Sequence, residues 1–113
     1  MIHTPAAPTT FSGDQLEMLH DMLEEQRRFR IDQLTEPTPE PWTMTEVELE
    51  IRETILRGAQ LALADVESAL DRMRLGTYGT CVHCGAQLPG ERLEVVPQAA
   101  LCMPCQQRAD AHR

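Results

Sequence analysis

Aromatic side chains are scarce in this sequence: they make up 4% of its 113 residues, and only one is tryptophan. Phe and Trp normally supply much of a compact core, so their scarcity favours an elongated helical molecule over a globule. No run of 18 apolar residues occurs, and we therefore expect no membrane-spanning helix. The first ten residues, MIHTPAAPTT, lack the basic region and apolar core of a signal peptide. We expect a cytoplasmic protein.

The sequence also lacks an excess of positive charge and any catalytic motif. The formal net charge is −8, whereas modules that bind nucleic acids are usually basic because they neutralise phosphates. This balance argues against DNA or RNA as the main partner and favours a protein with a basic cavity or channel. The only serines, Ser12 and Ser68, lie outside any nucleophile motif, and no glycine-rich phosphate loop occurs. The sequence therefore predicts a protein that is not an enzyme.

The first predicted helix begins at Ser12, because Ser12 and Gln15 have the spacing of a capping box. Apolar residues then recur on one broad face, from Leu16 to Leu34. The helix is expected to stop near Leu34, before the prolines of TEPTPEPW. Residues 1–11, which precede it, are interpreted as a disordered tail.

A second, longer helix is predicted after Trp42, with Thr43 and Glu46 as its capping box and Gly76 as its C-cap. Its seam alternates spacings of three and four for about four heptads, the pattern of coiled-coil packing. Arg52 alone breaks the apolar set. The seam residues are Leu49, Arg52, Leu56, Ala59, Leu63, Val66, Leu70 and Met73.

The expected fold is mainly α. The two helices, joined by a short polar connector, form a long antiparallel hairpin (a coiled coil) over residues 12–75, with its tip at residues 35–43. Residues 76–113 form a small module that holds a C4 zinc finger, a β-prone piece (LEVV) and a short C-terminal helix starting near Pro104.

Four cysteines carry the strongest chemical signal. Cys81 and Cys84 form one C-x2-C pair, Cys102 and Cys105 form another, and seventeen residues separate the pairs. Two such turns offer four soft thiolates to one metal, which is the spacing of a closed structural zinc site. We predict one Zn²⁺ that supplies folding energy to this module. Four thiolates leave no open position for water, so a catalytic zinc is not expected.

Other uses of these cysteines are less favoured. An iron–sulfur cluster also accepts four cysteines, although a closed, ribbon-like spacing favours zinc. A redox-active C-x-x-C needs a thioredoxin-like context, which the sequence does not show. His83 lies between the first two cysteines and can in principle coordinate a metal. With four thiols available, we interpret it as an exposed bystander.

Residues 69–109, ALDRMRLGTYGTCVHCGAQLPGERLEVVPQAALCMPCQQRA, resemble the C4 zinc finger of the bacterial DksA/TraR family. The shared features are G-T-Y-G before the first cysteine, C-x-x-C-G, an ERLE run after Pro89 and Gly90, and the ALC-x-x-C ending. A generic zinc ribbon does not share the ERLE run. The preceding hairpin suits the family by its architecture rather than by motif.

The resemblance implies a transcription regulator that binds RNA polymerase rather than DNA. Members insert their coiled coil into the secondary channel, so that the hairpin tip lies near the catalytic centre and alters initiation. Their zinc module and last helix rest against the outside of the enzyme. In this sequence the implied tip contacts are Glu36, Glu40, Trp42, Thr43 and Glu46. The alternative is a zinc-stapled coiled-coil adaptor, or a stress-related interaction protein, that acts on another protein target.

The sequence departs from the family pattern at two places. Well-studied members carry Asp-x-x-Asp-x-Ala at the tip, whereas the connector here has no aspartate. Alarmone-responsive members use basic residues at positions that correspond to Asp65, Val96 and Gln106. None of the three is basic, so binding of guanosine tetraphosphate is not expected at such a site.

Overall fold

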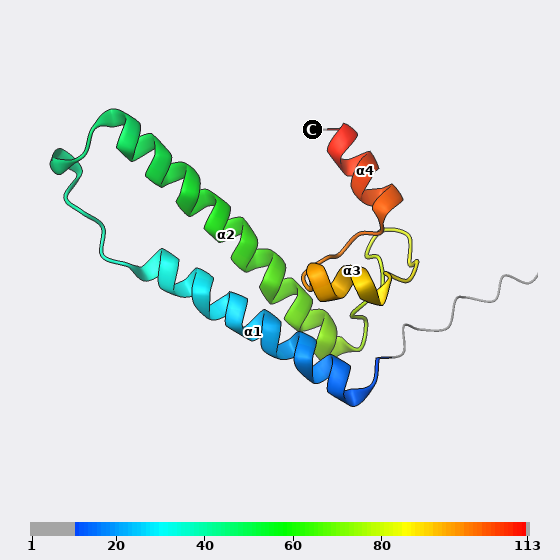
Figure 1. Ribbon diagram of the computed structural model, residues 1–113. Helices are drawn as coiled ribbons and strands as arrows, with labels where there is room; N and C mark the ends of the chain where they lie inside the picture. Colours follow the sequence, from blue (N-terminus) through cyan, green and yellow to red (C-terminus); the bar gives the residue numbers. More distant parts are fainter. Residues whose placement is uncertain (1–10, 113) are drawn as a thin grey trace, which may run out of the picture.

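Two long helices form a hairpin that dominates the molecule (Figure 1). The computed structural model describes residues 11–112; α1 spans Gly13–Thr35 and α2 spans Glu46–Leu75. A short 3-10 helix, η1, spans Pro41–Thr43 in the connector. Within residues 11–112 there is no strand, only an isolated bridge between Thr80 and Gln87. The predicted mainly α fold is confirmed.

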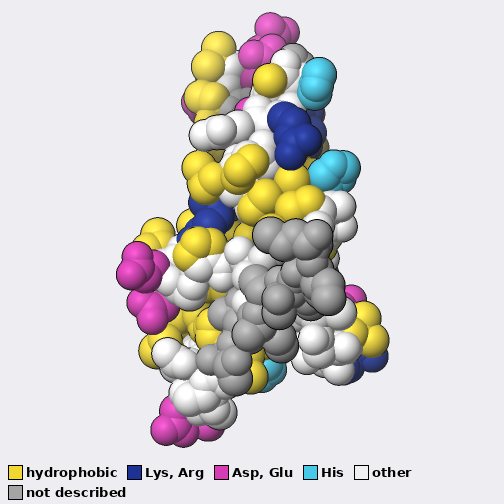
Figure 2. All heavy atoms as spheres, turned by 90° about the vertical axis from the view of Figure 1, so that its right-hand side faces the viewer, with side chains coloured by type: hydrophobic (Ala, Val, Ile, Leu, Met, Phe, Trp, Pro, Cys, Tyr) yellow, Lys and Arg dark blue, Asp and Glu magenta, His cyan; other side chains and the backbone are white. Residues whose placement is uncertain are grey.

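Basic side chains are few and separate on the face shown in Figure 2.

The start of α1 is fixed by hydrogen bonds between residues that are close in the sequence. The Ser12 hydroxyl accepts a hydrogen bond from the Gln15 backbone N–H, and the Gln15 side chain accepts one from the Ser12 N–H. The predicted capping box is therefore present. At the same end of the hairpin, Gly76 follows α2 with a φ of 79°, a left-handed conformation that suits a glycine C-cap.

The cap of α2 differs from the prediction. Thr45 is the cap, and its hydroxyl accepts a hydrogen bond from the Glu48 N–H at 3.1 Å. The prediction of a capping box at Thr43 was wrong, because Pro41 starts the 3-10 helix that contains Thr43. The Thr43 hydroxyl instead donates to the carbonyl of Glu40 at 2.7 Å. Helix α2 consequently starts at Glu46 rather than including it as a third residue.

The predicted seam of α2 faces α1. All eight seam residues are buried or half-buried, and Ala59 and Val66 are the most completely covered. Arg52, the polar member, donates from Nη2 to the hydroxyl of Thr38 at 3.2 Å. The arginine that interrupts the heptad pattern therefore links the connector to α2 by a hydrogen bond.

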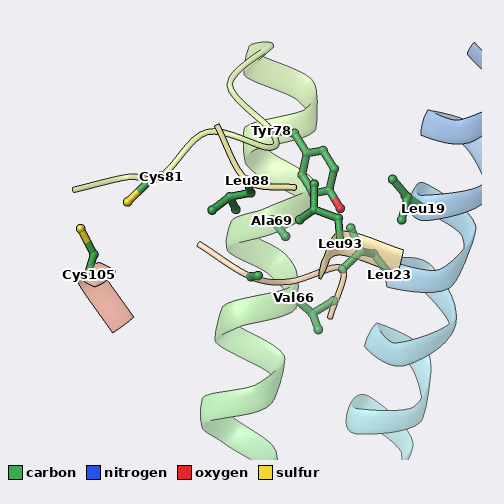
Figure 3. Close-up of a cluster of buried hydrophobic side chains, with 10 residues drawn as sticks. Leu19, Leu23, Val66, Ala69, Tyr78, Cys81, Leu88, Leu93 and Cys105 are labelled. Carbon is green, nitrogen blue, oxygen red and sulfur yellow. The ribbon is translucent and has the colours of Figure 1, made fainter. Parts of the chain in front are cut away.

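The hydrophobic core lies at the base of the hairpin, where α1 and α2 meet the cysteine module (Figure 3). Leu19 and Leu23 of α1 are at most 1% exposed and pack in one cluster with α2 and the module. The finger and the hairpin base thus share one core, although the sequence changes character at residue 76. The other members of the cluster are Val66, Ala69, Tyr78, Cys81, Leu88, Leu93, Ala99 and Cys105.

Phe11 also packs against this core, which corrects the predicted tail over residues 1–11. Its ring centroid lies 5.8 Å from that of Tyr78. Gly79 has a φ of 85°, and a Cβ there would come within 3.1 Å of the Phe11 ring, so the approach requires glycine. The rest of the predicted tail, residues 1–10, lies outside the described residues.

The cysteine module contains two short helices, α3 (Gly90–Val95) and α4 (Met103–Ala111). The β-prone interpretation of LEVV was wrong, because Leu93 and its neighbours belong to α3. Burial of Leu93, which is 0% exposed, outweighs the strand preference of the valines. The predicted C-terminal helix is present as α4, with Pro104 in its first turn.

Arg72 is a buried cation that joins α2 to the module. It is 9% exposed, and its Nη1 donates to the Ser68 hydroxyl at 2.6 Å. Its Nη2 lies 3.5 Å from the carbonyl oxygens of Gln98 and Ala99. Burial lowers the pKa of the guanidinium below its usual value. The carbonyl groups bring partial negative charge to a cation that has no buried carboxylate within bonding distance among the described residues.

Tyr78 makes a second polar link across the same junction. Its buried hydroxyl donates to the carbonyl of Pro97 at 2.8 Å. Burial raises the pKa of Tyr78 from 10.0 to about 12, although the nearby Arg72 opposes this shift. The neutral phenol is therefore the form that the folded protein favours.

Replacement of Tyr78 by Phe is expected to lower the free energy of unfolding by about 1–3 kcal/mol, because the buried Pro97 carbonyl loses its donor. Urea titration of the zinc-loaded protein at neutral pH measures this difference. Because folding raises the pKa of Tyr78, its contribution is complete below pH 10.0 and declines as the pH rises through about 12. The gap between wild type and Tyr78→Phe should narrow over that window; a constant gap would contradict the assignment.

Candidate metal centre and hairpin tip

The four cysteines converge on one point of the finger. Their sulfur atoms all lie within 4.8 Å of one another, and the Sγ atoms of Cys84 and Cys102 are 3.7 Å apart. That distance is far too long for a disulfide. Thiolates at about 2.3 Å from a tetrahedral zinc ion are separated by roughly 3.8 Å. The donor set and its spacing therefore fit one structural zinc ion.

The two cysteine pairs are held by different local structures. The first pair lies on a turn in which the Gly85 N–H donates to the Cys81 carbonyl at 3.0 Å, with Gly85 at a φ of 78°. A left-handed residue is needed there, which glycine provides. In the second pair, Cys102 is the N-cap of α4 and Cys105 lies in the first turn of that helix. A bond from the Val82 N–H to the Ala100 carbonyl, at 2.9 Å, joins the two halves.

The sulfurs differ in how deeply they lie. Cys81 and Cys105 are 2% and 4% exposed and belong to the shared core, and Figure 3 shows their sulfurs directed toward each other. Cys102 is half-buried and Cys84 is exposed. The centre is therefore anchored in the core on one side and reaches the surface on the other.

The thiols also differ in acidity. Burial alone would raise the pKa of Cys81, but hydrogen bonds from the backbone of Cys84, Cys102 and His83 lower it to about 6. Side-chain hydrogen bonding to Cys102, followed by burial, raises the pKa of Cys105 to about 12. Without a metal ion the cluster therefore favours a thiolate at Cys81 and a thiol at Cys105. A divalent cation removes this conflict, because all four ligands can then be thiolates.

Arg108 is a neighbour of the centre that the cysteine spacing did not predict. Its Nη2 lies 3.8 Å from the Cys105 sulfur, and its Nε is 3.5 Å from the Pro104 carbonyl. Its position three residues after the last cysteine, one helical turn along α4, is the signal that would have found it. The guanidinium places positive charge beside a site whose four thiolates outweigh the charge of one zinc ion. His83 is exposed and lies outside the four-sulfur group.

The predicted tip residues lie together at the end of the hairpin opposite the finger (Figure 1). All five, Glu36, Glu40, Trp42, Thr43 and Glu46, are exposed, and the Trp42 side chain is 80% accessible. The structure joins Glu40 and Thr43 through the hydrogen bond described above, whereas Glu36 caps α1 and Glu46 begins α2. This end of the hairpin therefore exposes three carboxylates and an uncovered indole. Their role in contacting a partner stays a prediction.

Comparison with known proteins identifies the cysteine module. Residues 76–111 match the model of the prokaryotic dksA/traR C4-type zinc finger. General stress protein 16O of Bacillus subtilis (strain 168) is 46% identical over 44 residues, which cover 39% of this chain and 27% of that protein. An uncharacterized protein of Aquifex aeolicus (strain VF5) is 33% identical over 48 residues, covering 42% of this chain and 33% of that protein. Each match thus spans a third or less of the curated relative.

The likeness extends to the hairpin at the level of the fold. The solved structure of transcription factor DksA2 from Pseudomonas aeruginosa matches with a TM-score of 0.69, covering 89% of this chain and 87% of that one. The sequence identity over this match is 23%, so the comparison establishes a shared fold. Among the described residues, no helix combines the length and apolar character needed to span a bilayer. Residues 76–111 therefore match the prokaryotic dksA/traR C4-type zinc finger, and this chain carries that finger on a helical hairpin with the fold of DksA2.

Proposed function

We propose that this chain regulates transcription by binding RNA polymerase, with the connector of its hairpin placed in the secondary channel. The observation that carries the proposal is the family finger at the base of a long hairpin whose far end is exposed and acidic. The finger resembles that of regulators which act in this way. The molecule measures 65 Å along its longest axis and 21 Å along its shortest, a shape suited to a narrow channel.

Charge supports the same partner. Residues 35–51 contain five carboxylates, at Glu36, Glu40, Glu46, Glu48 and Glu50, and no Lys or Arg. An acidic probe is attracted into a channel lined by positive charge, which raises the rate of association and fixes its orientation. The separate basic side chains in Figure 2 form no continuous patch on that face, which favours a protein partner over nucleic acid.

The proposed role requires no catalysis by this chain. Four thiolates close the coordination sphere of a zinc ion and leave no position for an activated water. The zinc ion would hold the finger against the base of the hairpin, and the finger with α4 would rest on the outside of the polymerase. Such a regulator works in the cytoplasm, as the sequence led us to expect.

A second candidate is an adaptor that uses the same zinc-stapled hairpin on another protein target. Two observations favour it. The relative that is 46% identical over 44 residues is named a general stress protein, and the connector lacks the aspartates of well-studied polymerase regulators. The two candidates share a fold and a metal, and differ only in the protein that the hairpin contacts.

Retention of core RNA polymerase separates the two candidates. We expect the immobilised, zinc-loaded chain to retain the purified enzyme at micromolar concentration. Combined substitution of Glu36→Gln, Glu40→Gln and Trp42→Ala should change the yield of initiated transcripts at least about threefold while retention stays within about twofold, because the finger and base still dock. Failure of the wild-type chain to retain polymerase would exclude the leading proposal.

A matched control places the same chemistry elsewhere on the hairpin. Glu17→Gln, Glu25→Gln and Met18→Ala remove two carboxylates and one exposed apolar side chain from α1, far from the connector. With this variant, the yield of initiated transcripts should equal the yield with the wild-type chain. Equal effects of the two triple variants would show that loss of charge, rather than the connector itself, is responsible.

A further inference from the structure

A groove runs along the hairpin next to the connector. It has a volume of about 360 Å³ and is bordered by Gln33 and Glu36 at the end of α1. On the α2 side it is bordered by Glu48, Ile51 and Ile55. The two helices lie close together at the base and separate toward the connector, as Figure 1 shows. The groove is therefore open where the shared core, at the other end, no longer holds the helices together.

Large apolar side chains in this groove are left uncovered. Ile51 is 55% exposed and Ile55 is 51% exposed, and the two lie one turn apart on the same side of α2. The neighbouring seam residues Leu49 and Leu56 are half-buried, and Leu56 also borders the groove. Exposed isoleucines in such a groove form a surface that gains free energy when a partner covers it.

The charge around the groove is mainly negative. Glu36 and Glu48 are part of its wall, and Glu40, Glu46 and Glu50 lie in the adjoining connector and first turns of α2. The one cation that borders it, Arg52, is bonded to Thr38 of the connector. A binding partner therefore meets apolar side chains flanked by carboxylates, which complement an apolar segment that carries Lys or Arg.

We propose that this groove binds an amphipathic helix of a partner protein, whose apolar face packs on Ile51 and Ile55 and whose Lys or Arg side chains face the surrounding carboxylates. A third helix fits because the isoleucines have a spacing of four residues, which interlocks with the grooves of another helix. The inference goes beyond the proposed function, since it concerns the groove that borders the tip and holds for any protein that supplies such a helix.

Other occupants fit less well. A second copy of this chain would bring two sets of five carboxylates together, because both copies carry the acidic residues 35–51. The N-terminal residues 1–10 contain no Lys or Arg, so they do not complement the acidic wall. Both occupants are nevertheless distinguished from a basic helix by the following experiment.

The test uses the full zinc-loaded chain and two labelled peptides made of leucine and lysine. One peptide places its leucines on a single helical face, and the other has the same composition in scrambled order. Fluorescence anisotropy should show the amphipathic peptide binding at least about tenfold more tightly than the scrambled one, a difference of about 1.4 kcal/mol. The double substitution Ile51→Ser and Ile55→Ser should abolish this preference.

The control is Leu61→Ser, which removes an apolar side chain of α2 that is 70% exposed but does not border the groove. It should bind both peptides like the wild type, with equal zinc content and helical circular dichroism in all variants. Equal binding of the two peptides, or equal losses in the two variants, would overturn the proposal. The proposal would also fail if sedimentation showed that the wild-type chain forms a dimer and that the double substitution makes it monomeric, because a second copy would then fill the groove. It would fail as well if the peptide bound only after deletion of residues 1–10, because those residues would then fill it.

This outcome is independent of polymerase retention. If the chain retains polymerase but shows no preference for the amphipathic peptide, the groove proposal is wrong and the proposed function stands. If the chain prefers the amphipathic peptide but does not retain polymerase, the proposed function is wrong and the groove proposal stands.

Discussion

A Cys105→Ser variant is expected to lose its zinc ion and to unfold at a much lower temperature than the wild-type protein. Serine does not supply a thiolate, so the site falls to three ligands, and a structural zinc ion contributes roughly 10–16 kcal/mol to the folding of isolated fingers at neutral pH. Cys105 is also 4% exposed and part of the core cluster, so the new hydroxyl is buried among apolar side chains. Zinc content by mass spectrometry and thermal unfolding by circular dichroism measure the two effects.

Val82→Ser is the matched control for this variant. Val82 lies between the ligands of the first pair, its side chain is 60% exposed, and only its backbone N–H bonds to the Ala100 carbonyl. This control should keep one zinc ion per chain, as should His83→Ala if His83 is a bystander. A Cys105→Ser protein with a full equivalent of zinc and the wild-type melting temperature would refute the four-cysteine site.

A Leu23→Ala variant is expected to lower the free energy of unfolding by about 2–5 kcal/mol and to release zinc faster to a chelator. Leu23 is 0% exposed and belongs to α1, yet it lies in the cluster that contains Cys81 and Cys105. A cavity there loosens the support of two ligands that are far away in the sequence. Urea titration measures the stability, and a colorimetric chelator in excess measures the release rate.

Leu61→Ala removes the same side chain from an exposed position of α2, where 70% of it meets solvent. It should change the unfolding free energy by less than about 0.5 kcal/mol and leave zinc release unchanged. If Leu23→Ala destabilises the helices but zinc leaves at the wild-type rate, the hairpin and the finger do not act as one unit. Comparison of the two variants therefore separates the effect of disturbing the shared core from the effect of shortening any leucine side chain.

The parts of the fold that the sequence predicted well depend on local spacing. The pairs around Cys81 and Cys102 are short turns, and their separation fixes the number and type of ligands before any fold is known. The capping box at Ser12 and the half-buried seam of α2 follow in the same way from residues within one or two helical turns.

The errors arose where distant or competing interactions decide the structure. Thr43 and Thr45 are each followed by a glutamate at the capping-box spacing, and only the 3-10 helix at Pro41 selects Thr45. Phe11 sits beside proline-rich, polar sequence, but its ring fits over Gly79 once the finger is folded. No periodicity reveals such a contact, because the two residues lie far apart in the sequence.

The position of the core has a mechanical consequence for the connector. The hairpin is anchored by packing at its base, beside the metal centre. A rotation at the base therefore moves the connector end farther than any other part of the hairpin. Helix α2 has 30 residues, which makes the arm about 45 Å long. A rotation of roughly 5° at the base displaces the far end by about 4 Å, more than the length of a hydrogen bond. Small repacking around Leu23, Arg72 or Tyr78 is thus amplified into a change of reach at Trp42.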